Sequence, residues 1–270
     1  MKEKRITALI LAVLLLVGGG YCGYRFLKHE KAQNEKINTL QGQVTLLNEK
    51  LAGNSEAVEF TSSVGDGFDY LAIGNSITRH GICDCWWGEW GMAASEPSRD
   101  YYHKVVEGLE KKHGHINTAV CTGYVWEVQS HDRDETFEIL DSWLVPGIDL
   151  ITVQLSENAL DLSTFEKDCE SLFLHIREMC GTDCQIIIID DFWSDEKNVM
   201  KKRVAEGLGL CFVDLSDIRG KSEYQAGMET AVSGLDGKEH IIEHSGVAAH
   251  PGDEMMKVIA ERVLEKLTSR

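Results

Sequence analysis

The chain has 270 residues, and its 27 Lys and Arg against 44 Asp and Glu give a formal net charge of −17. Hydrophobic residues make up 43% and charged residues 26%, a composition that can bury a core and excludes long-range disorder. The first 30 residues carry a net charge of +3, so the rest of the chain carries −20. Nucleic acid is excluded as a partner of this acidic body, because phosphate binding needs a basic face.

The amino terminus combines a basic cap with a long apolar run. After Met1–Arg5, the 19 residues from Ile6 to Tyr24 contain no charged side chain, which is about the length of a membrane-spanning helix. We expect residues 1–27 to form an uncleaved membrane anchor with its basic flank in the cytoplasm, which places the rest of the chain outside. A signal peptide cleaved near Gly18–Gly20 and a lipoprotein signal at Cys22 are the alternatives.

We interpret residues 28–67 as a helical stalk followed by a linker. Apolar residues between Ile37 and Leu51 recur at spacings of 3 and 4, which is the seam of about two heptads. This pattern predicts either a coiled coil that makes a homo-oligomer or an amphipathic spacer helix, since two heptads are marginal alone. The polar stretch Asn54–Gly67 then leads into a globular domain, residues 68–270.

The globular domain alternates short apolar runs with amphipathic segments. The apolar runs predict five buried strands: Phe68–Gly74, Ile116–Cys121, Asp149–Leu155, Cys184–Asp190 and Leu210–Leu215. The amphipathic segments predict five helices: Tyr101–Lys112, Asp132–Trp143, Ser163–Cys180, Asp195–Gly207 and Asp253–Thr268. Continuous apolar strands separated by helices predict a parallel sheet covered on both faces, so we expect a doubly wound α/β domain.

Ligands bind such sheets at the carboxyl ends of the strands, so the segments after the strands form the candidate site. Ser76 follows the first strand and is placed as a nucleophile with its backbone N–H toward a developing oxyanion, although Ser is also a favoured helix cap. Asn158 follows the third strand and either donates its amide to the same oxyanion or satisfies a local turn. His250 lies in a loop before the last helix, where it is placed as the base.

Together these segments resemble the sequence blocks of the SGNH, or GDSL-like, hydrolase superfamily over about residues 68–268. The block with the serine nucleophile resembles GNSIT, the block with an oxyanion asparagine resembles QLSEN, and the block with the histidine resembles AAHPGDE. The resemblance implies a flavodoxin-like three-layer α/β/α sandwich and serine-dependent ester hydrolysis without a cofactor. It assigns Ser76 as the nucleophile, His250 as the base and Asn158 as an oxyanion donor.

Two positions depart from the pattern of this superfamily. An Asp usually stands three residues before the His, where this chain has Val247. We therefore expect a Ser-His dyad, in which a backbone carbonyl, Glu243 or Asp253 orients the imidazole in place of that Asp. The second block usually supplies a Gly whose backbone N–H joins the oxyanion hole, and Gly123 is the loose match here.

Tryptophans gather near the candidate site. Trp86, Trp87 and Trp90 follow the nucleophile segment, and Trp126 follows the second strand. We interpret these four side chains as an aromatic wall for a sugar ring or an acyl group, with buried loop packing as the alternative, because Trp carries a large apolar area.

The cysteines and histidines indicate no metal site. Of the 8 Cys, all but one lie outside the apolar run, and the pairs Cys83/Cys85 and Cys180/Cys184 are close in sequence. An exported domain permits disulfides, so Cys180–Cys184 is a candidate, although pairing cannot be read from the sequence. No CxxC pair recurs and the histidines lack ligand spacing, so we expect no zinc.

The sequence as a whole predicts an outward-facing serine esterase of the cell membrane. Its expected substrate is a carbohydrate or cell-surface polymer that carries acetyl or other short acyl esters. An O-acyltransferase that uses the same nucleophile and a catalytically weak carbohydrate-binding protein are the alternatives.

Overall fold

The computed structural model describes residue 60, residues 64–129 and residues 133–268. The predicted anchor and nearly all of the predicted stalk and linker lie outside these residues. Among the described residues, no helix combines the length and the apolar character needed to span a membrane. The described helices and strands run from Phe68 to Glu265, within the residues that the sequence predicts as a globular domain.

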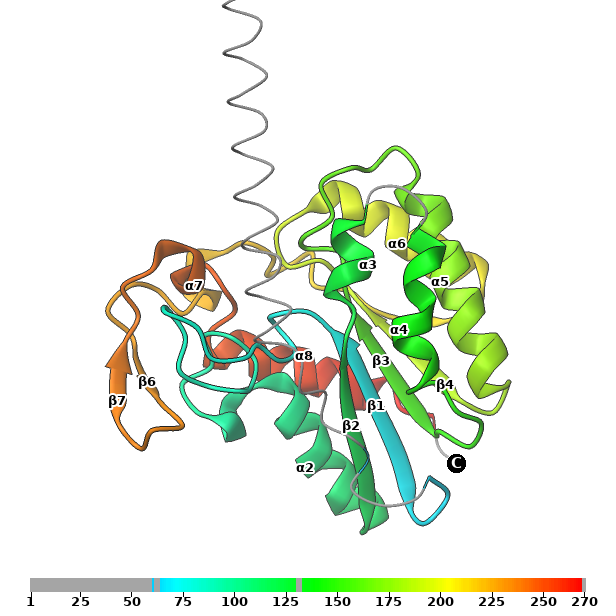
Figure 1. The fold of residues 1–270 in the computed structure, drawn as a ribbon, viewed down its shortest axis with the longest axis horizontal. Coiled ribbons are helices and arrows are strands. Elements are labelled where there is room, and N and C mark those ends of the chain that lie inside the picture. The colour runs from blue at the N-terminus through cyan, green and yellow to red at the C-terminus, as the bar shows by residue number, and fades with distance from the viewer. Residues whose placement is uncertain (1–59, 61–63, 130–132, 269–270) are drawn as a thin grey trace, which may run out of the picture. The chain divides into compact units, whose positions relative to one another are not determined.

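A five-stranded parallel sheet forms the centre of this domain (Figure 1). Its strands are β1 (Phe68–Gly74), β2 (Ile116–Thr122), β3 (Leu150–Gln154), β4 (Gln185–Ile189) and β5 (Cys211–Val213). They lie in the order β2-β1-β3-β4-β5, and every pair is parallel, so the predicted sheet is confirmed. The strand order reverses between β1 and β3, which is the switch point where ligands bind doubly wound sheets.

Helices cover both faces of the sheet and make it a three-layer sandwich (Figure 1). One face carries two helices that pack against each other, α2 (Tyr101–His113) and α8 (Asp253–Glu265). The opposite face carries four helices: α3 (Tyr124–Val128), α4 (Phe137–Asp141), α5 (Phe165–Cys180) and α6 (Asp195–Gly207).

The strands are mostly apolar because both of their faces are buried. In β1, Tyr70 and Ala72 belong to the core under α2 and α8, whereas Leu71 and Ile73 belong to the core under the other helices. A polar group in such a strand needs a partner, and the Tyr70 hydroxyl finds one in Thr152 at 2.9 Å. The apolar runs that located the strands therefore reflect burial from two sides.

Several short elements differ from the prediction or escaped it. The segment predicted as one helix over Asp132–Trp143 is described as the 3₁₀ turn η2 (Arg133–Thr136) followed by α4. The elements that the sequence analysis missed are α3, η1 (Pro97–Arg99), η3 (Ser222–Tyr224), β6 (Ala231–Ser233), β7 (Glu239–Ile241) and α7 (Ser245–Ala248). Each has at most five residues, too few for a periodic pattern to emerge.

No disulfide joins the seven cysteines of the described residues. Cys180 and Cys184 lie close together, and a hydrogen bond between their side chains lowers the pKa of Cys180. The sulfur atoms of Cys83 and Cys85 lie 3.6 Å apart. The disulfide considered between Cys180 and Cys184 is therefore not formed in this structure.

Candidate active site

Ser76 lies in a tight turn directly after β1, at the carboxyl end of the sheet. The N–H groups of Thr78 and Arg79 both donate to the Asn75 carbonyl at 3.0 Å and close the turn. Position 74 must be a glycine, because a Cβ there would lie 1.8 Å from the Thr78 hydroxyl oxygen. The turn thus presents a partly exposed Ser76 at the switch point between β1 and β3.

His250 reaches this serine from the other end of the domain sequence. Its Nε2 lies 2.9 Å from Ser76 Oγ, and its Nδ1 lies 2.7 Å from the carbonyl oxygen of Gly246. A carbonyl can only accept, so Nδ1 carries the proton and Nε2 offers its lone pair to the serine hydroxyl. The two side chains are therefore arranged as a nucleophile and its base.

A backbone carbonyl takes the place that an Asp carboxylate holds in a catalytic triad. Val247, at the position of that Asp, is 2% exposed and belongs to the core under α2 and α8. Asp253 is engaged elsewhere, because its carboxylate accepts from the N–H and hydroxyl of Ser95 at 2.8 and 2.6 Å. A carbonyl fixes the tautomer of His250 but stabilises an imidazolium less than a full charge does.

Asn158 lies at the same edge of the sheet, and Gly123 is committed elsewhere. Asn158 Nδ2 donates one hydrogen to Glu127 Oε2 at 2.7 Å, and an amide nitrogen carries a second hydrogen. The Gly123 N–H, expected in the oxyanion hole, donates instead to the Gly74 carbonyl at 2.8 Å and extends the contact between β1 and β2. Within the described residues the Ser76 N–H makes no hydrogen bond, so it remains the backbone donor at the nucleophile.

Two carboxyl groups beside Ser76 had no role in the sequence analysis. Glu127 from α3 and Glu157 from the turn after β3 both accept from Asn75 Nδ2, at 2.8 and 2.7 Å. Burial raises the pKa of Glu127, and burial together with the charge of Asp191 raises the pKa of Glu157 to about 8. Both residues stand within five positions of a strand end, which is the signal that identified Ser76.

Three of the four tryptophans interpreted as a substrate wall are core residues. Trp86, Trp90 and Trp126 are 0%, 3% and 2% exposed, so no ligand reaches their rings. Trp86 and Trp90 pack edge to face at 5.5 Å between ring centroids. Trp87 is partly exposed and stacks on His240 of β7 at 4.4 Å. The connection between β1 and α2 has little regular structure, and its large side chains supply the buried area it needs.

A further aromatic side chain, Trp193, lies against His250. The two rings are 5.2 Å apart at an angle of 82°, and the indole Nε1 donates to the Ala249 carbonyl at 3.2 Å. Trp193 is 39% exposed, so part of its ring is open to a ligand. It follows β4 by four positions, and inspection of that strand end would have found it from sequence.

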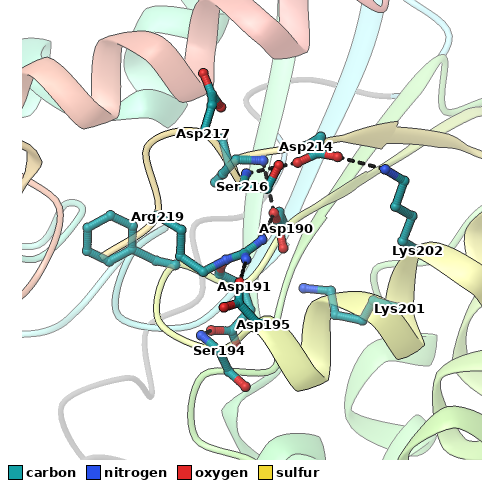
Figure 2. A network of polar contacts seen from close by, with 12 residues as sticks. Asp190, Asp191, Ser194, Asp195, Lys201, Lys202, Asp214, Ser216, Asp217 and Arg219 are labelled. Carbon is teal, nitrogen blue, oxygen red and sulfur yellow. Dashed lines mark hydrogen bonds and ion pairs between the residues drawn. The ribbon is translucent and has the colours of Figure 1, made fainter. Parts of the chain in front are cut away.

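A network of ion pairs and hydrogen bonds surrounds Asp190, Asp191 and Asp195 (Figure 2), and Trp193 belongs to the same segment of the chain. Arg219 pairs with the carboxylates of Asp190 and Asp195, and its Nε donates to the Asp191 carbonyl at 2.8 Å. The Asp191 side chain in turn accepts from the Trp193 N–H at 2.8 Å. The turn after β4 is thereby fixed through both its side chains and its backbone, which keeps the indole beside His250.

No protein-family model and no curated protein matches this chain. Among solved structures, a lipase from a goat rumen metagenome aligns at 13% identity and a TM-score of 0.43, over 73% of this chain and 95% of that one. A member of the lipolytic G-D-S-L family from Veillonella parvula aligns at 14% identity and 0.43, over 75% of this chain and 100% of that one. A two-domain esterase active on acetylated mannans aligns at 15% identity and 0.44, over 73% of this chain and 48% of that one.

The similar structures also include proteins described as GDSL-like lipases from Bacteroides uniformis and Bacteroides ovatus. At these identities and TM-scores the likeness does not assign an activity, so the case for one rests on the geometry of the site.

Proposed function

We propose that this chain is a serine esterase of the SGNH superfamily that removes acetyl or other short acyl groups through an acyl-enzyme. The observation that carries the proposal is the contact of 2.9 Å between Ser76 Oγ and His250 Nε2 at the switch point of the sheet. The carbonyl of Gly246 supports it, because it holds the proton on Nδ1 and leaves Nε2 as the acceptor.

The geometry supports a two-step reaction. Ser76 Oγ attacks the carbonyl carbon of the ester while His250 Nε2 takes the hydroxyl proton. The Ser76 N–H and the second amide hydrogen of Asn158 donate to the oxyanion, where losing one donor typically costs about 10²–10³ in turnover. His250 then returns the proton to the departing alcohol, and a water molecule repeats the sequence on the acyl-enzyme and releases the acid.

The proposed substrate is a carbohydrate or cell-surface polymer that carries these esters. The exposed part of Trp193 supports this class, because an indole next to the nucleophile offers a flat apolar surface to a sugar ring. We further propose that the domain works outside the cell membrane. The uncharged run from Ile6 to Tyr24 and its basic flank support that location.

A fluorophosphonate probe tests the nucleophile directly. The full-length chain in mild detergent is treated with the probe, and the labelled residue is identified by mass spectrometry. We expect labelling at Ser76 that is lost in Ser76→Ala, is strongly reduced in His250→Ala and persists in the exposed control Ser98→Ala. Absence of labelling on a folded wild-type chain would refute the proposal.

Product analysis separates the esterase from its alternatives. With an acetylated oligosaccharide, an esterase releases free acetate whether or not a second sugar is added. Transfer of the acyl group to the added sugar would instead identify an acyltransferase with the same nucleophile. Sugar binding that survives Ser76→Ala, with no turnover by the wild type, would identify a carbohydrate-binding protein.

A further inference from the structure

Glu127 stands where three strand ends meet. It belongs to α3, which begins two residues after β2, and its carboxyl group reaches the turns that follow β1 and β3. Its side chain is completely buried. The transfer of protons between Ser76 and His250 makes no use of it, so the presence of an ionisable group at this buried position calls for an explanation.

The contacts of Glu127 join the two halves of the site. Oε1 accepts from Asn75 Nδ2 at 2.8 Å and from the Ser156 N–H at 2.5 Å, and Oε2 accepts from Asn158 Nδ2 at 2.7 Å. Asn75 immediately precedes the nucleophile, and Ser156 and Asn158 belong to the turn after β3. One carboxyl group therefore sets the nucleophile turn and the turn of the oxyanion asparagine at a defined distance from each other.

The turn after β3 is strained and is held in place by side chains. Ser156 has a φ of 139°, a backbone conformation that favours glycine. Its N–H is bound by Glu127, and its hydroxyl contacts Asp191 Oδ2 at 2.7 Å and Lys201 Nζ at 3.1 Å. A non-glycine residue keeps such a conformation only where its surroundings impose it, and such residues gather at functional sites.

The carboxyl group also decides how the Asn158 amide is oriented. An Asn side chain presents NH₂ on one side and a carbonyl oxygen on the other, and an acceptor selects the NH₂ side. Glu127 Oε2 holds Nδ2 at 2.7 Å, which fixes the nitrogen and thereby the direction of its second hydrogen. Donors that are oriented before the reaction need no rearrangement as the oxyanion forms.

We propose that Glu127 is a positioning residue for ester hydrolysis, which holds the amide nitrogen of Asn158 in register with the turn that carries Ser76. This inference rests on the proposed function, because it assigns Glu127 a role in that reaction. Glu127 acts through Asn158 and Asn75 and touches neither the substrate nor the reacting atoms.

The substitution Glu127→Gln tests the role while keeping the shape of the side chain. The glutamine offers one acceptor oxygen, which can keep the three donors at Oε1, namely Asn75 Nδ2 and the N–H groups of Ser156 and Asn158. Its NH₂ group then faces Asn158 Nδ2 and cannot accept a hydrogen bond from it. With p-nitrophenyl acetate we expect kcat to fall about 10- to 100-fold, less than or equal to the loss of an oxyanion donor, while KM changes less than about threefold.

A double-mutant cycle shows whether Glu127 acts through Asn158. In an Asn158→Ala background there is no amide to orient, so Glu127→Gln should lower kcat by less than about threefold. Asp69→Asn is the matched control, since Asp69 is also fully buried and accepts from the Gly65 N–H at 2.6 Å and from Asn117 Nδ2 at 3.0 Å, at the opposite end of β1. We expect its kcat to stay within about twofold of wild type.

Each outcome decides the inference once thermal melts show which variants are folded. A folded Glu127→Gln with wild-type kcat, a full effect in the Asn158→Ala background, or an equal loss in Asp69→Asn would overturn it. If Glu127→Gln does not fold, Glu127→Asp, which keeps the carboxyl group but is one methylene shorter, should show the same loss of kcat, and wild-type kcat there would overturn the inference. In all these cases the wild type is active, whereas a wild type without hydrolysis or Ser76 labelling refutes the proposed function and this inference together.

Discussion

Replacing Gly74 by Ala perturbs the turn that carries Ser76 through a single methyl group. The added Cβ would lie 1.8 Å from the Thr78 hydroxyl oxygen, 2.4 Å from its Cβ and 3.1 Å from its Cγ2. Rotation of the Thr78 side chain cannot remove the contact with its Cβ, so the backbone of the turn has to move. Overpacking of this kind typically costs about 1–3 kcal/mol.

The expected losses of thermal stability and of activity follow from this displacement of the turn. For a domain of about 200 residues, a cost of about 1–3 kcal/mol lowers Tm by about 2–12 °C. A shift of about 1 Å at a reacting group typically costs about 100-fold in rate, so activity should fall more than stability does. Differential scanning fluorimetry and the initial rate with p-nitrophenyl acetate measure the two effects on the same sample.

Gly207→Ala is the matched control for this substitution. Gly207 ends α6, and a Cβ built there meets no atom within 4 Å. Alanine is favoured over glycine in helices by up to about 1 kcal/mol, so this variant should be as stable as wild type or slightly more stable, with unchanged activity. A Gly74→Ala variant with wild-type Tm and rate would refute the argument that packing against Thr78 defines the nucleophile turn.

Three further outcomes follow from the structure. Because the pKa of Glu157 is raised from 4.5 to about 8, the folded state keeps a proton between these pH values that the unfolded state has lost, so the free energy of unfolding should fall as pH rises from about 4.5 to 8, by at most about 1.4 kcal/mol per pH unit. Urea titrations should show that Glu157→Gln flattens this profile, and a flat wild-type profile would contradict the raised pKa. Trp86→Ala should cost about 3–5 kcal/mol, as for other buried aromatic side chains, whereas Trp87→Ala should cost clearly less; equal losses in thermal melts would contradict their different burial. Trp193→Ala should raise KM for an acetylated oligosaccharide by about 2- to 12-fold and leave KM for p-nitrophenyl acetate unchanged, and an equal change for both substrates would exclude stacking on a sugar.

The strands and the approximate place of the site could be predicted because they depend on local patterns. β1 was predicted with its observed bounds, since a strand buried on both faces is mostly apolar, and this run ends at Gly74, before the polar pair Asn75 and Ser76. The rule that ligands bind at the carboxyl ends of parallel strands then led to Ser76, and through the third strand to Asn158. A short turn after an apolar run is visible in the order of residues alone.

The partners of these residues depend on chain segments that meet only in the fold. The imidazole of His250 is oriented by a carbonyl because α7, a turn of four residues, places Gly246 O at 2.7 Å from Nδ1. Nothing in the composition of so short an element distinguishes a helix from a loop. The sequence could show that an Asp is missing at Val247, but which of several groups replaces it was a question of distance.

Only the tertiary structure shows which tryptophans are buried and which residues Glu127 contacts. A Trp near a site is equally able to pack under a loop or to face a ligand, and only the arrangement of neighbouring elements left Trp193 exposed while Trp86 became core. In the sequence, nothing distinguishes Glu127 from the rest of the 44 Asp and Glu residues. It accepts a hydrogen bond from Asn158 only because three strand ends meet in the fold. Sequence alone determined the five strands of the parallel sheet and, to within about two residues, where they end, because burial of a strand is a local pattern. Tertiary structure decided which side chains meet, because hydrogen bonds depend on distances between segments that are remote along the chain.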